Sequence, residues 1–263
     1  MVDTGPTLAT SVSADRKERF DRMTVPEMLL EVADRCPTAP ALVDGEVRMD
    51  FQSLVNASGR VAERLREFGV EPGDTVGILL PNSWQYAVTY FGAQLAGAIT
   101  VLVNTRFTVR EVEHVCADSG VAVVITNAEL AALVESSDRS IRAVDVAEIV
   151  DAASGSVQRT GVPIEDLPGL RSRGSDVAQL LYTSGTTGHP KGVMQLHSNL
   201  MFNARTVRER LGAAPGERTL IAAPMFHAIG IVSQLVGFIA AGATCVIMPT
   251  FEATKAVRLI VQE

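Results

Sequence analysis

Lysine and cysteine are both scarce in this sequence of 263 residues, and its N-terminus lacks an apolar segment. Lysine accounts for three of the 23 basic residues, and the net charge of −7 argues against a general nucleic-acid or anionic-membrane binder. The three cysteines lie far apart in apolar or helical contexts, so we expect buried, reduced thiols in a cytoplasmic protein, without a disulfide framework or metal site. The first 25 residues are polar and are not a secretory signal.

One segment is apolar enough to resemble a membrane span. Residues 228–248, AIGIVSQLVGFIAAGATCVIM, carry no charge over a length that can cross a bilayer. The character of the segment changes at Gly242, because the part before it is typical of a buried helix and TCVIM is typical of a β-branched strand. We therefore expect a helix, a turn and a buried strand here, and no transmembrane segment.

Helices and apolar strands alternate along most of the chain. Thr24 and Glu27 match a capping box at the start of a helix, and ALVDGEVRMDF predicts two strands around a tight turn. Between residues 52 and 126, helical spacing alternates with the apolar runs DTVGILL, AITVLV and VAVVIT. This order predicts an α/β fold of doubly wound, mainly parallel sheets flanked by helices.

Composition divides the chain into a polar tail over 1–23 and one domain over 24–263. Residues 151–176 are rich in Gly, Ser, Pro and charge, and we interpret them as a connection between two α/β layers. A weak internal similarity favours two layers, since FGAQLAGAITVLVN and FIAAGATCVIMP share an apolar helix, an Ala-Gly-Ala hinge and an apolar strand. Convergent use of the same turn residues explains this similarity about as well as duplication of a segment does. The final FEATKAVRLIVQE predicts an amphipathic helix, after which this pattern requires a further strand.

A loop of small and hydroxyl-bearing residues follows the apolar run that ends near residue 182. Residues 180–192, LLYTSGTTGHPKG, combine three glycines, Lys191 and four hydroxyl side chains between Thr183 and Thr187. Gly185, Gly188 and Gly192 permit positive φ angles and close approach of a ligand, and exposed N–H groups in such turns bind anions. A purely structural hairpin needs fewer glycines and no lysine. A Walker A loop does not fit, because Pro190 precedes the lysine.

The residues 182–193, YTSGTTGHPKGV, closely resemble the phosphate-loop signature of the adenylate-forming (AMP-dependent) synthetases. That family comprises acyl-CoA synthetases, nonribosomal adenylation domains and luciferases. Residues 73–126 resemble its N-terminal sheet region in the order of helices and strands and in the residues that end them. The resemblance implies an incomplete N-terminal domain of the adenylate-forming fold. It also implies a reaction in which a carboxylate attacks the α-phosphate of ATP, pyrophosphate leaves, and a thiol, usually that of coenzyme A, captures the acyl-adenylate.

The resemblance assigns roles to the loop residues by position. The residues that it places around the β- and γ-phosphates of ATP are Thr183, Ser184, Gly185, Thr186, Thr187, Gly188 and Lys191. It also makes Thr183 a candidate ligand of Mg²⁺. Their role would be to orient the transferring phosphoryl group and to stabilise its charge. His189 occupies a position that varies within the family, and we interpret it as a residue without a functional role.

A second segment, APMFHAIG at residues 223–230, resembles the family's Pro-x-Phe-His pattern. The resemblance places Phe226, His227 and Gly230 beside the acyl and pantetheine sites, whereas a lone histidine beside an apolar run is usually a satisfied core residue. A histidine here is typical of acyl- or aryl-CoA ligases, and amino-acid-activating domains generally carry an aspartate nearby. The predicted substrate is a simple carboxylic acid, and the apolar region 220–248 favours a fatty or other apolar acid.

Three further features favour structural roles. His114 lies among apolar residues on a predicted helix. His197 precedes SNL at a predicted helix start, and we interpret it as part of the cap of that helix. The segment NTRFT at 104–108 matches a family loop that we expect to serve packing. The sequence shows no Ser-His-Asp order and no metal-ligand spacing.

Other elements of the family have no counterpart within the 263 residues. These are the aromatic-Gly-Thr-Glu segment, the ribose-binding aspartate, the hinge and the C-terminal lysine. We therefore interpret the chain as the N-terminal part of an AMP-forming acyl-CoA synthetase and expect negligible adenylation by this polypeptide alone. The alternatives are an adenylation domain that loads a carrier protein and a non-catalytic module derived from the fold. The sequence leaves open whether the protein forms a homodimer.

Overall fold

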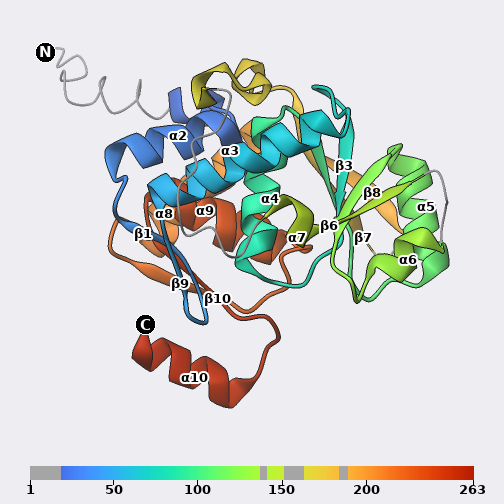
Figure 1. Ribbon diagram of the computed structural model, residues 1–263. Coiled ribbons are helices and arrows are strands. Elements are labelled where there is room, and N and C mark those ends of the chain that lie inside the picture. The colour runs from blue at the N-terminus through green and yellow to red at the C-terminus, as the bar shows by residue number, and fades with distance from the viewer. Residues whose placement is uncertain (1–18, 137–140, 151–162, 184–188) are drawn as a thin grey trace, which may run out of the picture.

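The computed structural model describes residues 19–136, 141–150, 163–183 and 189–263 (Figure 1). The strands are β1 (Pro40–Asp44), β2 (Val47–Asp50), β3 (Thr75–Ile78), β4 (Ile99–Leu102), β5 (Val123–Thr126), β6 (Arg142–Asp145), β7 (Val177–Thr183), β8 (Lys191–Leu196), β9 (Arg218–Ile221) and β10 (Thr244–Ile247). The α-helices are α2 (Val25–Arg35), α3 (Phe51–Glu67), α4 (Trp84–Leu95), α5 (Val109–Ser119), α6 (Ala131–Glu135), α7 (Val146–Ile149), α8 (His197–Leu211), α9 (Gly237–Ala241) and α10 (Ala253–Gln262). The described residues also include two 3-10 helices, η1 (Ile164–Asp166) and η2 (Pro168–Arg171), and a π-helix, η3 (Ile229–Val236).

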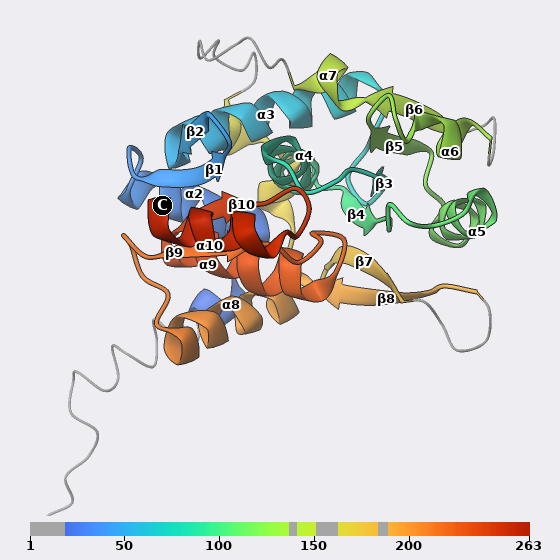
Figure 2. The same cartoon turned by 90° about the horizontal axis from the view of Figure 1, so that it is seen from below.

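The strands form two mainly parallel sheets, which confirms the predicted α/β class. The six-stranded sheet has the order β6-β5-β3-β4-β7-β8, and only β8 in it runs antiparallel to its neighbour. The four-stranded sheet has the order β2-β1-β10-β9, in which β2 is the antiparallel member. Figures 1 and 2 show the two sheets side by side, with α4 between them.

The connection at 151–176 does not separate two layers, contrary to our prediction. β7 and β8 follow the connection, yet they join the sheet of β3 to β6. β1 precedes the connection, yet it pairs with β10, where Leu42 lies opposite Cys245. Each sheet therefore combines segments from both halves of the chain. Apolar periodicity identifies strands but does not encode which distant strands pair.

Local signals in the sequence fix several element boundaries. The capping box at α2 is confirmed, because Thr24 N–H donates to Glu27 Oε2 at 2.8 Å and Thr24 Oγ1 accepts from Glu27 N–H at 3.3 Å. The echoed Ala-Gly-Ala hinges join α4 to β4 and α9 to β10. Gly97 and Gly242 adopt φ of 78° and 77° there, a left-handed conformation that favours glycine.

The uncharged segment 228–248 folds as predicted into helix, turn and strand. It comprises η3, α9 and β10, and all four residues of β10 are buried. Among the described residues, no helix has the length and apolar character needed to cross a membrane. The final helix α10 is also confirmed, and Val257, Ile260 and Val261 on it are exposed.

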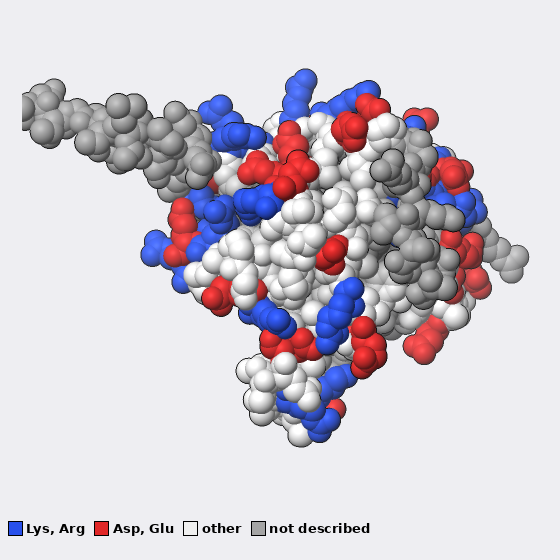
Figure 3. Space-filling view, turned by 60° about the vertical axis from the view of Figure 1, so that its left-hand side comes forward, with Lys and Arg blue, Asp and Glu red and all other residues white. Residues whose placement is uncertain are grey.

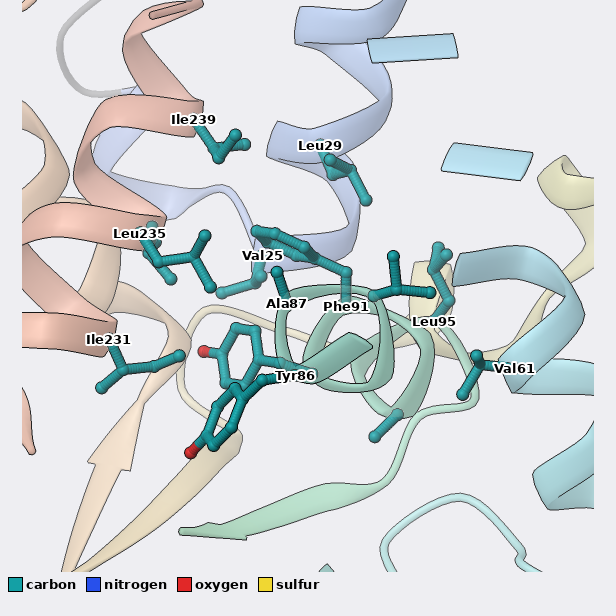
Figure 4. Close-up of a cluster of buried hydrophobic side chains, with 14 of the residues drawn as sticks. Val25, Leu29, Val61, Tyr86, Ala87, Phe91, Leu95, Ile231, Leu235 and Ile239 are labelled. Carbon is teal, nitrogen blue, oxygen red and sulfur yellow. The ribbon is translucent and has the colours of Figure 1, made fainter. Parts of the chain in front are cut away.

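The largest core cluster is built around α4. Figure 4 shows Tyr86 and Phe91 of α4 beside Val25 of α2 and Leu235 of η3, and all four side chains are buried. Burial of a large apolar side chain stabilises the fold by about 1.5–3 kcal/mol. Trp84 N–H, in the first turn of α4, donates to Asp44 Oδ2 of β1 at 3.0 Å. The Tyr90 hydroxyl of α4 donates to Gln179 Oε1 of β7 at 2.8 Å, so α4 is bonded to both sheets.

The packed region begins inside the predicted polar tail. Met23 is buried and Phe20 packs against the core. Residues 1–18 lie outside the described part of the chain. On the face shown in Figure 3, acidic and basic side chains are interspersed. The three cysteines are not disulfide bonded, and Cys116 and Cys245 are buried.

Candidate functional site

A buried asparagine at the carboxyl ends of the parallel strands connects segments of both sheets, including the predicted site segment 223–230. Asn82 follows β3 and is only 5% exposed. Its Nδ2 donates to Ala223 O at 3.0 Å and to Met248 O at 3.2 Å, and its Oδ1 accepts from Met225 N–H at 2.7 Å. One side chain thus joins the segments that follow β3, β9 and β10. Ligands of open α/β sheets bind at this edge.

Thr183 and Lys191 are direct partners across the β7–β8 hairpin. Residues directly opposite each other in an antiparallel pair project their side chains from the same face of the ribbon. Both residues are exposed, and they lie at the loop end of the hairpin, where the β7–β8 pairing stops. A hydroxyl and an ammonium group are therefore presented together. Ser184, Gly185, Thr186, Thr187 and Gly188, predicted to bind phosphate, lie outside the described residues.

The opposite face of the same hairpin end packs toward α5. Tyr182 is buried, and its hydroxyl donates to Asp118 Oδ2 at 2.6 Å. Burial, together with the bond to Asp118, raises the pKa of Tyr182 well above its usual range. A Cβ on Gly192 would lie 2.9 Å from Cζ of the Tyr182 ring. Gly192 is not at positive φ, so its predicted role is corrected: the tyrosine ring, not a ligand, approaches it.

His114 of α5 contacts the residue that precedes Lys191. Its Nε2 lies 2.9 Å from Pro190 O, and because a carbonyl oxygen can only accept, Nε2 carries the proton. The His114 ring also lies against the His189 ring, with centroids 4.9 Å apart. A structural role for His114 is confirmed. His189, which we predicted to have no functional role, contacts His114.

The segment 223–230 combines a buried ring with an exposed imidazole. Phe226 is buried, His227 is exposed, and their rings meet edge to face with centroids 4.7 Å apart. The exposure of His227 contradicts the alternative of a satisfied core histidine. Partial burial, and secondarily the charge of Arg106, lowers the pKa of His227. The neutral imidazole is thus favoured at pH 7.

Gly230 is required by backbone packing. A Cβ at this position would lie 2.3 Å from Pro224 O, at the start of the π-helix. The structure therefore explains the glycine without a ligand, and its contact with a substrate stays a prediction.

Asn82 and Arg106 were not identified from the sequence as site residues. In the loop 104–108, Phe107 is buried, which confirms the predicted packing role. Arg106 of the same loop is exposed and acts electrostatically on His227. A polar residue a few positions after an apolar strand is the signal available in the sequence, because such positions lie near the carboxyl edge of a parallel sheet.

His197 does not cap its own helix, contrary to our interpretation. The cap of α8 is closed by Asn199, whose Oδ1 accepts from Leu196 N–H at 3.0 Å. His197 is 4% exposed, and its Nδ1 accepts from Val25 N–H at 3.2 Å, in the first turn of α2. It therefore satisfies an otherwise unpaired N–H of another helix. Burial lowers the pKa of His197 to about 4.

Within the described ranges, no group of three His, Cys, Asp or Glu side chains is placed to hold a metal ion. Thr183 is the predicted metal ligand. Its exposed hydroxyl is an oxygen donor, the type that Mg²⁺ takes alongside water and phosphate oxygens. The residues present fit an ion brought in with a phosphate ligand.

Comparison with known proteins agrees with this geometry. A family model described as "AMP-binding enzyme" matches residues 29–263. The chain is 32% identical over 238 residues to the long-chain-fatty-acid–CoA ligase FadD13 of Mycobacterium tuberculosis, covering 90% of this chain and 47% of the relative. It is 34% identical over 228 residues to a feruloyl-CoA synthase of Amycolatopsis sp, covering 86% and 44% respectively. The chain thus spans about half the length of the curated relatives it matches.

A solved structure shows the same arrangement of elements. It is the O-succinylbenzoate coenzyme A synthetase (MenE) of Bacillus subtilis in complex with ATP and magnesium ion. The TM-score is 0.77 at 29% identity, over 89% of this chain and 60% of that one.

Proposed function

The chain belongs to the family of AMP-binding enzymes, and from this premise we propose that it forms the N-terminal part of an AMP-forming acid–CoA ligase. In that reaction a carboxylate attacks the α-phosphate of ATP and pyrophosphate leaves. The sulfur of coenzyme A then attacks the acyl carbon, and AMP leaves. The observation that carries the proposal is the pairing of Thr183 with Lys191 at the carboxyl edge of the sheet.

The phosphate end of the site is formed by the two sides of the hairpin. Lys191 would place its positive charge on the β- and γ-phosphates, where negative charge accumulates as pyrophosphate leaves. Thr183 would contribute its hydroxyl to Mg²⁺, together with phosphate oxygens and water. The ion, when bound, neutralises phosphate charge. Ser184 to Gly188 are proposed to add N–H and hydroxyl donors.

The acid end of the site is proposed to lie at Phe226 and His227. The neutral imidazole of His227 is exposed and can donate or accept a hydrogen bond, while the buried Phe226 ring supports the imidazole edge to face. The charge of Arg106 favours a carboxylate near this position. Asn82 holds the segment in place through Met225 N–H and Ala223 O.

A fatty or other apolar acid is our proposal for the substrate. The exposed side chain of Ile229 favours an apolar acyl group. The relatives by themselves do not choose among acids, because a fatty-acid ligase and a feruloyl-CoA synthase match at 32% and 34% identity. Coenzyme A is the preferred acceptor, since the segment 223–230 has the histidine that the family resemblance associates with acyl- and aryl-CoA ligases. The segment lacks an aspartate, which favours a simple carboxylic acid over an amino acid. A carrier protein is the alternative.

Acid-dependent ATP–pyrophosphate exchange tests the proposal. We first read the coding sequence past residue 263: synthetase motifs support a CoA ligase, a following carrier domain supports the alternative, and a stop codon supports a non-catalytic module. The exchange assay then compares the 263-residue chain with the longer product, using a panel of fatty, aryl and alicyclic acids. We expect exchange by the longer product and negligible exchange by the chain alone. A longer product that is inert with every acid contradicts the proposal.

A further inference from the structure

One helix contacts both sides of the glycine-rich segment. On α5, His114 Nε2–H donates to Pro190 O at 2.9 Å, and Asp118 Oδ2 accepts from the Tyr182 hydroxyl at 2.6 Å. His114 and Asp118 are four residues apart, so they lie one turn apart on the same face of the helix. Figure 2 shows α5 beside the loop end of the β7–β8 hairpin.

These two bonds act on the residues next to the phosphate ligands. Tyr182 directly precedes Thr183, and Pro190 directly precedes Lys191. Because side chains alternate along a strand, Tyr182 points to the face opposite Thr183. The α5 side chains therefore bind Tyr182 and Pro190 at the hairpin end and leave exposed the face from which Thr183 and Lys191 project.

The helix is itself a rigid support. Its N-terminus is closed by a capping box in which Thr108 N–H donates to Glu111 Oε2 at 2.8 Å. Val112 and Val115 are fully buried in the same apolar cluster as Tyr182. The position of α5 is thus set by packing, and its polar side chains carry that position to the hairpin.

We propose that His114 and Asp118 are positioning residues of the phosphate site, which fix the separation and direction of Thr183 and Lys191. The proposal rests on the proposed function for the identity of the ligand. The physical reason is orientation: a donor pair that is held in place loses little freedom when a phosphate binds, and small displacements are costly. The bond from the Tyr182 hydroxyl to the Asp118 carboxylate is charge-assisted and stronger than a neutral one.

The first test needs no ligand. Amide hydrogen exchange is measured in the purified chain for wild type, His114→Ala and Asp118→Ala. We expect exchange near Tyr182, Lys191 and Gly192 to accelerate about tenfold, since each variant removes a bond worth about 1.4 kcal/mol or more. The amide of Ala178, at the far end of β7, should keep its rate. Unchanged exchange at the loop end, or an equal rise at both ends of β7, overturns the proposal.

The second test uses inorganic pyrophosphate with Mg²⁺ as the probe. We expect His114→Ala and Asp118→Ala to raise its dissociation constant about tenfold. His114→Gln keeps a side-chain N–H and Asp118→Asn keeps an acceptor, so both should stay within about threefold of wild type. Glu113→Ala, an exposed change on the same helix, is the matched control and should bind as wild type does.

The two hypotheses fail in different ways. Equal pyrophosphate affinity in all variants overturns the positioning role, as does a loss that the conservative variants fail to rescue. A wild-type chain that binds no pyrophosphate contradicts the proposed function, and the exchange rates then still decide whether α5 fixes the hairpin end.

Discussion

The side chain of Asn82 accepts a hydrogen bond from Met225 N–H at 2.7 Å, although 143 positions separate the two residues in the chain. The same side chain donates to Ala223 O and Met248 O. Because Asn82 follows β3 of the six-stranded sheet and its partners follow β9 and β10 of the other, it joins the two sheets at their carboxyl edges. The position of the segment with Phe226 and His227 depends on this contact.

Replacement of Asn82 should therefore be costly. In Asn82→Ala, Met225 N–H and two carbonyl groups lose their partner in a buried setting, so we expect a loss of about 2–4 kcal/mol in the free energy of unfolding. Urea denaturation of the purified chain measures it. Asn56→Ala removes an exposed bond to Gln52 and should change the stability by only about 0.5 kcal/mol. Equal stability of the two variants contradicts the account.

The buried His197 predicts a stability that falls in acid. Its folded pKa of about 4 lies below the ordinary value of 6.5, chiefly because burial disfavours the charged form. The unfolded state therefore takes up the proton first. The contribution is complete above pH 6.5 and is lost as the pH falls toward 4, by about 3 kcal/mol in all.

Comparison with His197→Asn isolates this contribution. The asparagine Oδ1 can replace Nδ1 as the acceptor for Val25 N–H and does not titrate in this range. The free energies of unfolding are measured at pH 7.5 and pH 4.5. We expect wild type to lose more stability than the variant, and parallel pH dependences would show that His197 is not the group responsible.

Gly230→Ala should destabilise the fold without any ligand present. The new Cβ would meet Pro224 O at 2.3 Å, so the backbone of the π-helix must shift, at a cost of about 1–3 kcal/mol. Thermal unfolding compares this variant with Ala228→Ser, an exposed change in the same segment. If Gly230→Ala is as stable as wild type, packing does not explain the glycine and its predicted substrate contact gains support.

Arg106→Gln should raise the pKa of His227. Burial and then the charge of Arg106 lower that pKa, so removal of the charge removes one of the two causes. An NMR titration of the His227 ring protons measures the change. Arg110→Gln removes a charge at the start of α5 and serves as the control. An unchanged or lower pKa in Arg106→Gln would show that the guanidinium does not act on His227.

The sequence was sufficient for the local elements and for the family. The capping box of Thr24 and Glu27, the hinges at Gly97 and Gly242, and the apolar strands all depend on neighbouring residues, and such signals can be read in one dimension. The motif that contains Thr183 and Lys191 was predicted to follow a strand, and in the structure these two residues pair at the end of β7 and the start of β8.

Long-range contacts could not be predicted in this way. The pairing of Leu42 with Cys245 depends on how the two sheets are assembled, and no periodicity records it. The same holds for His197, whose sequence context suggested a cap on its own helix although its partner is Val25. For His114 and Asp118 the sequence indicated only that they lie on one helix. Their partners, Pro190 and Tyr182, follow from how α5 packs against the hairpin.

Binding of Mg·ATP to the purified chain tests the central claim most directly. Calorimetric titration compares wild type with Lys191→Gln and, as the matched control, Lys255→Gln on α10. We predict saturable binding by wild type and Lys255→Gln, and an affinity at least about tenfold lower in Lys191→Gln, because a charge-assisted contact with phosphate is lost. Equal affinities of Lys191→Gln and wild type, or no binding by wild type, would contradict the account.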